Sequence, residues 1–335
     1  MDVIIGIVDT CADAGVPLPL SKRCVMEKYV ILADVACDLS QEVRDFFQIE
    51  EYLPGHIHFS DGRDFPTTLD WTNIAREAFY TSLKNKKLEI STAPPSPEEY
   101  YLAFKKYAEE GFSILSLSIS SKISSTYNAA CSAAKRLQEE MPQATIRCVD
   151  TFRMSGAFGL LVMYAHKLKN EGASFDAVVA WVEENKHRVH QMGPIDDLLF
   201  VARRGRITMG KAIMGSFAGV KPMGDCNRDG YVSVLSNTKG VGRALDVTAR
   251  YVKAVGTELS EQYLLICHSN RQAYAEKLKE LLVQICAPKG VFVSDVFCGS
   301  GTNVGPGMVG VYFLGAPISE DLTVEKEALC SLLQG

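Results

Sequence analysis

The fold is decided by one stretch, Ser118-Ile-Ser-Ser-Lys-Ile-Ser-Ser-Thr-Tyr-Asn-Ala-Ala-Cys-Ser-Ala-Ala134. Just before its turn, residues 112–119 alternate between apolar and polar side chains, which predicts a β-strand. Towards its end, alanines recur at helical spacing and predict a helix over residues 126–141. A strand, a turn and a helix in this order form the repeating unit of an α/β sheet.

The turn between strand and helix carries four serines and one threonine and no acidic residue. Ser124 or Ser125 can cap the helix that follows, because the first N–H groups of a helix have no partner within it. The same N–H groups, together with several hydroxyls, also form a site for an anion. An ordinary serine cap and an anion site both fit this turn, and only other parts of the sequence can distinguish between these two interpretations.

Composition and charge narrow the class of protein. The 335 residues suffice for two domains, and 47% hydrophobic with 22% charged residues are typical of a globular protein. The formal net charge of -5 argues against binding to nucleic acids or anionic membranes. No run of eighteen apolar residues occurs, so we expect no integral membrane segment.

The N-terminus and the cysteines bear on location. The apolar run at residues 3–8 has acidic neighbours and no basic flank, so residues 1–27 are interpreted as an N-terminal extension rather than a secretory leader. The ten cysteines include no Cys-x-x-Cys pair, and Cys148, Cys267 and Cys286 lie in apolar segments. Buried, reduced thiols are typical of the cytoplasm, which is the predicted location.

The first half alternates strands with helices, which predicts a parallel sheet covered on both faces. Its best-defined helix begins with a capping box, in which Ser96 caps, Pro97 takes the first helical position and Glu99 reaches back. The predicted elements are strands 29–33, 114–119 and 145–149 and helices 41–48, 97–110, 126–141, 155–170 and 174–190.

The second half has a different pattern, in which residues 220–223 and 231–235 flank a polar turn and predict a hairpin. We place a domain boundary near residue 190, which gives an extension at 1–27, an N-terminal α/β domain at 28–190 and a C-terminal α/β domain at 191–335. The other predicted elements are helices 195–202, 209–217, 241–255, 272–285 and 324–333 and strands 263–268, 290–297 and 309–314.

A second turn, Thr92-Ala-Pro-Pro-Ser-Pro97, also places hydroxyls before a helix. The two turns can converge at the crevice where open α/β sheets bind ligands. Neither has an obvious histidine or carboxylate partner nearby in the sequence, so the hydroxyls suit hydrogen bonding to an anion better than nucleophilic attack. The dense basic cluster at 203–206 fits either a solvated turn or a clamp for carboxylate or phosphate.

Four weaker motifs predict no cofactor or metal. The glycine-rich residues 299–307 match neither a dinucleotide fingerprint nor a phosphate loop and are interpreted as a tight loop. Residues 225–230 mimic the start of a calcium loop but lack its closing glutamate, so a hairpin turn is favoured. His56 and His58 have no completing ligand set for a metal, and His268 is expected at the end of a strand.

Together these motifs resemble the DegV family of bacterial fatty-acid-binding proteins, from about Tyr29 to the C-terminus. Their order and spacing carry the resemblance, because no single motif is specific. The motifs are Ile31-Leu-Ala-Asp-Val-Ala-Cys-Asp-Leu39, Thr92-Ala-Pro-Pro-Ser-Pro-Glu-Glu-Tyr100, Ile119-Ser-Ser-Lys-Ile-Ser-Ser-Thr-Tyr127, Asp150-Thr151, residues 197–207, Val220-Lys-Pro222 and Gly305-Pro-Gly307.

The resemblance implies two α/β domains, the second with a mixed sheet, and one long-chain, palmitate-like fatty acid in a tunnel between them. The carboxylate is expected to bond to hydroxyls of Thr92 and Ser124, and the arginine-rich turn maps onto Arg203 and Arg206. Some family members present the fatty acid to a fatty acid kinase, which is the implied protein partner. The ligand-binding candidates are Thr92, Ala93, Ser124, Ser125, Asn303, Arg203 and Arg206.

Four positions depart from the family pattern. Val35 and Ala93 stand where the family usually has serine, Ser125 where it has glycine, and Asn303 where it often has histidine. Two hydroxyls and an imidazole are therefore missing. These departures bear on kinase-coupled activity more than on lipid binding, because Thr92 and Ser124 remain.

The leading hypothesis is a fatty-acid carrier that is not itself an enzyme. One alternative is a kinase-like enzyme for a small substrate on a related α/β fold, which requires a phosphate loop and clustered acidic metal ligands. The other is a lipid-sensing regulatory module, which requires a partner-dependent activity without lipid turnover.

Overall fold

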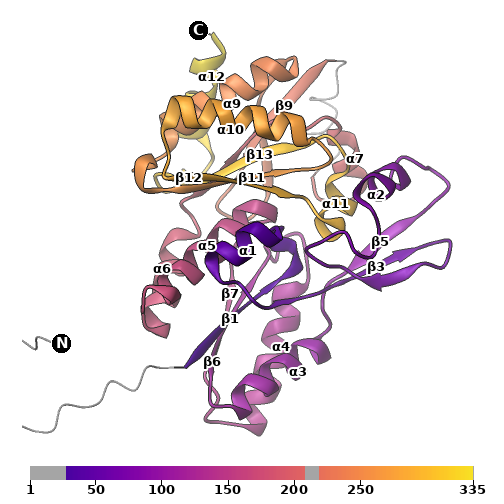
Figure 1. Cartoon of the computed structure of the whole chain (residues 1–335), viewed down its shortest axis with the longest axis vertical. Helices are drawn as coiled ribbons and strands as arrows, with labels where there is room; N and C mark the ends of the chain where they lie inside the picture. Colours follow the sequence, from indigo (N-terminus) through magenta and orange to yellow (C-terminus); the bar gives the residue numbers. More distant parts are fainter. Residues whose placement is uncertain (1–27, 208–218, 335) are drawn as a thin grey trace, which may run out of the picture.

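The computed structural model describes residues 28–207 and 219–334. Two main sheets lie one above the other, with helix α5 between them (Figure 1). The first sheet has the strand order β2-β1-β6-β7, and all its neighbouring strands are parallel. The predicted parallel sheet is therefore confirmed, with strands β1 (Tyr29–Asp34), β2 (Tyr52–Leu53), β6 (Ser113–Ser118) and β7 (Ile146–Asp150).

Helices cover both faces of this sheet, as predicted. On one face, α3 (Pro97–Glu109) and α4 (Thr126–Glu140) pack through aromatic residues of α3 and the small alanines of α4. The other face is covered by α1 (Gln41–Phe47), α5 (Ser155–Asn170) and α6 (Phe175–Asn185).

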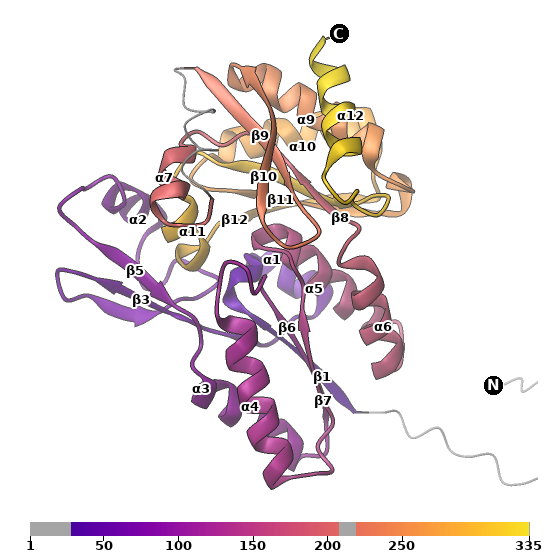
Figure 2. The same ribbon diagram turned by 180° about the vertical axis from the view of Figure 1, so that it is seen from behind.

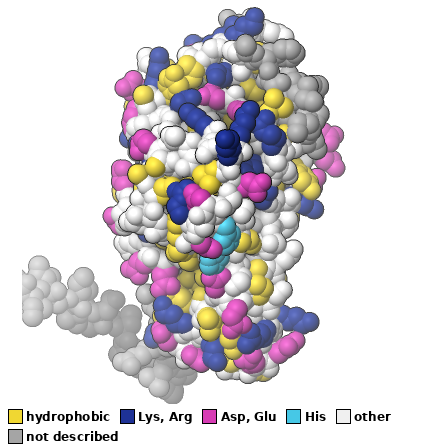
Figure 3. Space-filling view, turned by 90° about the vertical axis from the view of Figure 1, so that its right-hand side faces the viewer, with side chains coloured by type: hydrophobic (Ala, Val, Ile, Leu, Met, Phe, Trp, Pro, Cys, Tyr) yellow, Lys and Arg dark blue, Asp and Glu magenta, His cyan; other side chains and the backbone are white. Residues whose placement is uncertain are grey.

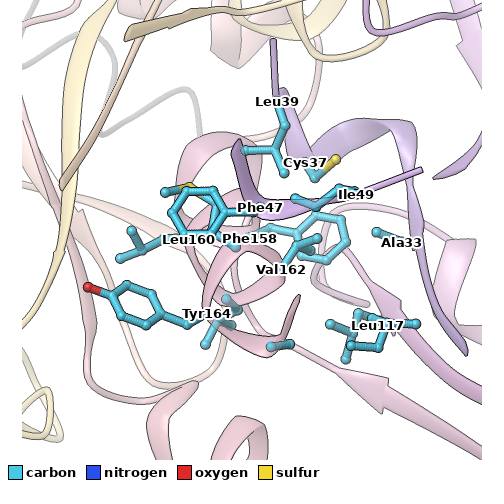
Figure 4. Packing of buried hydrophobic residues seen from close by; sticks show 14 of the residues in the cluster. Ala33, Cys37, Leu39, Phe47, Ile49, Leu117, Phe158, Leu160, Val162 and Tyr164 are labelled. Carbon is cyan, nitrogen blue, oxygen red and sulfur yellow. The ribbon is translucent and has the colours of Figure 1, made fainter. Parts of the chain in front are cut away.

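Helix α5 is apolar on nearly all sides because it separates the two sheets. It is buried from its first residue to His166, and Phe158 packs near Cys37 in the cluster drawn in Figure 4. Gly156 permits a close approach of the second sheet, because a Cβ there would lie 2.2 Å from the ring of Tyr312. The glycine thus sets how closely helix and sheet can pack.

The second sheet is mixed, which confirms the expected fold class. Its order is β12-β11-β13-β8; β11 and β12 are parallel, and the other pairs are antiparallel. Helices α9 (Val241–Val255), α10 (Gln272–Cys286) and α12 (Thr323–Gln334) pack with the outer side of this sheet. Its strands are β8 (Val189–Met192), β11 (Tyr263–His268), β12 (Gly290–Asp295) and β13 (Val309–Leu314).

Two small antiparallel sheets flank this frame. The predicted hairpin is present as β9 (Val220–Cys226) and β10 (Val232–Lys239) and crosses the second sheet in Figure 2. A three-stranded sheet, β4-β3-β5, was not predicted. It consists of β3 (His56–Phe59), β4 (Asp64–Pro66) and β5 (Ile90–Ala93), with α2 (Arg76–Ser82) alongside.

Short elements complete the described chain. These are the 3₁₀ turns η1 (Val35–Cys37) and η2 (Leu259–Glu261) and the helices α7 (Leu198–Arg203) and α11 (Cys298–Val304). Within the described ranges, no helix is both long and apolar enough to cross a membrane.

Three predicted elements differ from the structure. The helix expected over 174–190 ends at Asn185, because β8 follows it and pairs with β13. The tight loop expected at 299–307 is mostly the helix α11. The helix expected over 195–202 begins only at Leu198. The helix expected over 209–217 lies outside the described residues, and the domain boundary near 190 stays a prediction.

Candidate ligand-binding site

A cavity of about 230 Å³ lies where the first sheet meets the second. Asp34 at the end of β1 and Ile119 just after β6 reach it from the carboxyl edge of the parallel sheet. Met192 of β8 and Met223 of β9 reach it from the second half of the chain. The cavity therefore occupies the crevice at which open α/β sheets bind ligands.

Most of the cavity wall is hydrocarbon. Apolar side chains come from α7, the β9–β10 hairpin, α11, the chain just before β13 and the turn after β6. A mostly apolar, concave wall with few polar groups is typical of small-molecule sites. The apolar lining includes Ile119, Ile123, Met154, Ile195, Leu198, Val201, Ile207, Pro222, Val232, Val234, Val304 and Met308.

Two of the predicted residues meet within this cavity. The amide of Asn303 on α11 donates a hydrogen bond to the hydroxyl of Thr92 on β5 at 3.3 Å, and also one to the carbonyl of Gly299 at 3.4 Å. These residues are 211 positions apart in the chain. The tertiary structure thus joins a hydroxyl of the first half to an amide of the second half on one cavity wall.

The hydroxyl-rich turn after β6 contributes a separate pair of hydroxyls. The side-chain oxygens of Ser124 and Thr126 are 2.7 Å apart, and both residues line the cavity. Ser125 occupies the N-cap position of α4 but its side chain makes no capping hydrogen bond. Neither Ser124 nor Ser125 therefore caps α4 in the usual way. Ser124 Oγ accepts only a long hydrogen bond, 3.4 Å, from the backbone N–H of Thr126.

The structure brings five of the seven candidates to the cavity and leaves two outside it. Thr92, Ala93, Ser124, Asn303 and Arg206 line the cavity. Ser125 is exposed and does not line it. Arg203 is also exposed and lies 3.5 Å from the carboxylate of Asp197, as expected for a solvated turn.

Arg206 is the cationic candidate at the cavity. Its guanidinium donates to the backbone carbonyl of Arg204 at 2.5 Å, and no ion pair with a carboxylate is found for it among the described residues. Burial lowers the pKa of Arg206 below its ordinary value, because desolvation disfavours the charged form. A partly buried guanidinium without a counter-ion favours an anion within the cavity.

Asp34 is a cavity residue that the sequence analysis did not select as a site. Its carboxylate accepts hydrogen bonds from the backbone N–H groups of Ala36 and Ile119, each at 2.9 Å. Burial raises the pKa of Asp34 to about 6, and these two bonds only partly oppose that effect. Its place at the carboxyl end of β1 was the one signal that the sequence offered for such a role. That it lines a cavity could not be predicted, because other walls of the cavity come from the second half of the chain.

The weaker motifs have structural roles. Asp225 accepts a hydrogen bond from the backbone of Gln191 at 2.9 Å and pairs with His190, which ties the hairpin to β8. His268 ends β11, is buried and hydrogen-bonds to Gln272.

The histidine pair of β3 is engaged by acids. His56 lies 2.9 Å from the carboxylate of Glu99, and His58 lies 2.6 Å from that of Asp64. Figure 3 shows histidines of this face beside acidic side chains, with Lys and Arg side chains gathered above them. No cluster of three or more metal-ligating side chains occurs in the part of the chain that the structure describes.

Comparison with known proteins identifies the family to which this chain is similar. The model of the family described as "Uncharacterised protein, DegV family" matches residues 28–316. A DegV domain-containing protein of Clostridium perfringens is 32% identical over 290 residues, which cover 87% of this chain and 98% of the relative.

Solved structures agree in fold. A fatty acid binding DegV family protein from Streptococcus agalactiae has a TM-score of 0.71 and 25% identity, covering 86% of this chain and 99% of that one. The Streptococcus pneumoniae fatty acid kinase (Fak) B3 protein loaded with linoleic acid has a TM-score of 0.73 and 17% identity, with coverages of 86% and 99%. By its matched length, its relatives and its fold, the chain belongs to the DegV family.

Proposed function

We propose that this protein binds one long-chain fatty acid in the cavity between the two sheets. The observation that carries the proposal is the combination of a hydrocarbon wall with a few hydrogen-bond donors and one partly buried cation, Arg206. Thr92, Ser124 and Asn303 supply the neutral groups for the carboxylate. Each methylene removed from water contributes roughly 0.8 kcal/mol, so a sixteen-carbon chain of the palmitate type supplies most of the binding energy.

The protein acts as a carrier rather than an enzyme in this proposal. In support, Ser124 is hydrogen-bonded to another hydroxyl, that of Thr126, and not to a base that would activate it as a nucleophile. The likeness to the Fak B3 protein supports a fatty acid kinase as the partner to which the carboxyl group is presented. Burial of a carboxylate is strongly unfavourable without paired donors, which the cavity residues provide.

Lipid extraction tests the proposal. Protein purified without delipidation is denatured, extracted and examined by mass spectrometry, and about one long-chain fatty acid per chain is expected. The delipidated protein is then titrated with palmitate by calorimetry. A sample that yields no acyl chain and also fails to bind added palmitate contradicts the proposal.

A further inference from the structure

The turn of the β9–β10 hairpin, residues 227–231, reaches the first half of the chain beside the cavity. It lies next to the loops that lead into α4 and α5 (Figure 2). Both strands of the hairpin line the cavity, with Met223 on β9 and Val234 on β10 among the lining residues. The hairpin is thus a wall of the cavity, and its turn is a place where this wall meets the first half of the chain.

Two side chains of the first half hold the turn. The hydroxyl of Ser120, which follows β6, donates to the carbonyl of Gly230 at 3.1 Å, and a Cβ at residue 230 would lie only 2.2 Å from that hydroxyl oxygen. The guanidinium of Arg153, which follows β7, donates to the carbonyl of Asn227 at 3.0 Å. The N–H of Ser120 donates to the carbonyl of Arg153 at 2.9 Å, so the two loops are joined. We call the bonds from Ser120 and Arg153 to the turn the latch.

The latch contains a buried charge that bonds only neutral groups. Arg153 is fully buried. Its Nη1 donates to the carbonyls of Phe152 and Asn227, whereas its Nε and Nη2 have no hydrogen-bond partner in the part of the chain that the structure describes. Burial of a guanidinium without a carboxylate partner is unfavourable, and separation of the turn returns this group toward water. Desolvation therefore opposes the hydrogen bonds of the latch, and the docked turn is held weakly.

A strained residue lies at the contact with the turn. Phe152 has a φ of 51°, in the left-handed region that residues other than glycine rarely adopt. Its carbonyl accepts a hydrogen bond from the thiol of Cys226 at 3.5 Å as well as the one from Arg153. Such a backbone persists only where surrounding contacts hold it, and it is typical of switch regions. Because Cys226 belongs to the hairpin, separation of the turn removes one of these contacts and allows Phe152 to relax.

We propose that the latch controls exchange of the ligand: the docked turn retains a fatty acid, which enters or leaves when the turn separates from Ser120 and Arg153. This inference rests on the proposed function. A bound acyl chain that packs against Met223 and Val234 favours the docked hairpin, since a ligand shifts the population toward the state that it contacts better. The latch is also linked to the hydroxyl-rich turn, because the carbonyl of Ser120 accepts a hydrogen bond from the N–H of Ser124 at 3.2 Å.

Exchange kinetics test the latch. Delipidated protein is loaded with cis-parinaric acid, a fluorescent long-chain fatty acid, and its release into excess albumin is followed by stopped flow. Ser120→Ala removes one bond of the latch, so we expect release to be about two- to tenfold faster, the range for one hydrogen bond. Association should accelerate as well, so the dissociation constant should change less than either rate.

Ser121→Ala is the matched control, because Ser121 is the next residue in the same loop and does not line the cavity. This variant should release the probe at the wild-type rate. Release from Ser120→Ala at the wild-type rate overturns the latch and leaves the proposed function intact. A wild-type protein that binds neither cis-parinaric acid nor palmitate overturns both.

A disulfide tests the latch from the opposite direction. In Ser120→Cys with Gly230→Cys the two Cβ atoms lie 3.2 Å apart, close to the roughly 3.5–4.5 Å found in disulfides. The oxidised variant should release the probe more slowly than its reduced form, and dithiothreitol should restore the faster rate. The single variant Ser120→Cys, treated with the same oxidant, should show no slowing.

Peptide mapping identifies the cross-link. The tryptic peptides 107–122 and 229–239 contain no native cysteine, so a bond between them joins the two introduced residues. Because residue 230 has a φ of +89°, a cysteine there is strained, and the alanine variant remains an independent test. A mapped cross-link that leaves the release rate unchanged overturns the proposal.

Discussion

At the scale of single residues, the donors of the cavity differ in how far they are already engaged. Thr92 accepts a hydrogen bond from Asn303, so its own hydroxyl proton is free to point into the cavity. Ser124 shares a hydrogen bond with Thr126, and Arg206 bonds a backbone carbonyl but no carboxylate among the described residues. A carboxylate in the cavity can therefore accept from Thr92, from the Ser124–Thr126 hydroxyl pair and from the guanidinium of Arg206.

Replacing Ser124 by alanine is expected to weaken palmitate binding by about 1–3 kcal/mol, the range for a charged group left short of a donor. Ser125→Ala is the matched control, because Ser125 is adjacent in sequence but exposed and outside the cavity wall. Calorimetric titration of delipidated protein measures both. Equal affinities for the two variants would place the carboxylate elsewhere in the cavity.

At the scale of elements, α3 and α4 begin in different ways although serine precedes each. Ser96 Oγ accepts a hydrogen bond from the backbone of Glu99, whose carboxylate accepts one from the backbone of Ser96 at 2.7 Å. At α4 the side chain of Ser125 makes no such bond. The first helix start is stabilised by its capping box, whereas the second has no side-chain cap from Ser125.

Ser96→Ala is expected to lower the free energy of unfolding by about 1 kcal/mol, the usual contribution of a helix N-cap. Ser125→Ala should change it much less, since no capping bond is lost there. Urea denaturation followed by circular dichroism compares the two. A larger loss in Ser125→Ala than in Ser96→Ala would be inconsistent with this difference between the helix starts.

The packing of α5 against β13 gives a second expectation for an element. Gly156→Ala places a Cβ 2.2 Å from the ring of Tyr312, which is far too close for van der Waals contact. We expect this overpacking to lower the free energy of unfolding by about 1–3 kcal/mol. Gly242→Ala, on α9, is the control: nothing lies within 4 Å of its added Cβ, and alanine favours a helix. Thermal unfolding should show a lower midpoint for the first variant only.

At the scale of the whole molecule, Asp38 joins the two halves of the chain. Its carboxylate accepts hydrogen bonds from Ser155 on α5 at 2.6 Å and from the backbone of Phe297 at 3.0 Å, and its carbonyl accepts one from Ser294. Burial raises the pKa of Asp38 to about 7, and these bonds only partly oppose it. The junction between the sheets therefore contains a carboxyl group that holds its proton near neutral pH.

Asp38 should contribute stability that is lost as pH rises from about 4 to 7, while His166 and His187, whose pKa burial lowers to about 4, contribute in the opposite direction. In this window the folded protein keeps a proton on Asp38 that the unfolded chain has released, so raising the pH favours unfolding. The shift corresponds to an effect on the order of 2–4 kcal/mol. Asp38→Asn, which resembles the protonated acid and tolerates the left-handed backbone at this position, removes this contribution, so the stability of the wild type relative to the variant should fall as pH rises.

Urea midpoints measured between pH 4.5 and 7.5 check this expectation. The exposed Asp176 of α6 supplies the control Asp176→Asn, which should keep the wild-type slope. The same pH dependence in the wild type and in Asp38→Asn would mean that the carboxyl group at the junction is ionised throughout this interval.

Elements with strong local signals could be predicted from the sequence. The alternation of 112–119, the alanine pattern of α4 and the capping box of α3 are local properties, and the observed elements follow them closely. The sheet at β3, β4 and β5 was missed because its strands are short. The strand β8 was taken as the end of a helix, because its pairing with β13 involves residues more than a hundred positions away.

The sequence by itself determined the class of each long element, the parallel first sheet and the resemblance to the DegV family, because hydrophobic period, capping and motif order are properties of neighbouring residues. Only the tertiary structure decided which hydroxyls share a cavity, that Asn303 bonds Thr92, and that Ser125 and Arg203 lie outside it. It also buried Asp34 and Asp38. Contact, burial and desolvation depend on chain segments that meet only after folding, so no local pattern contains them.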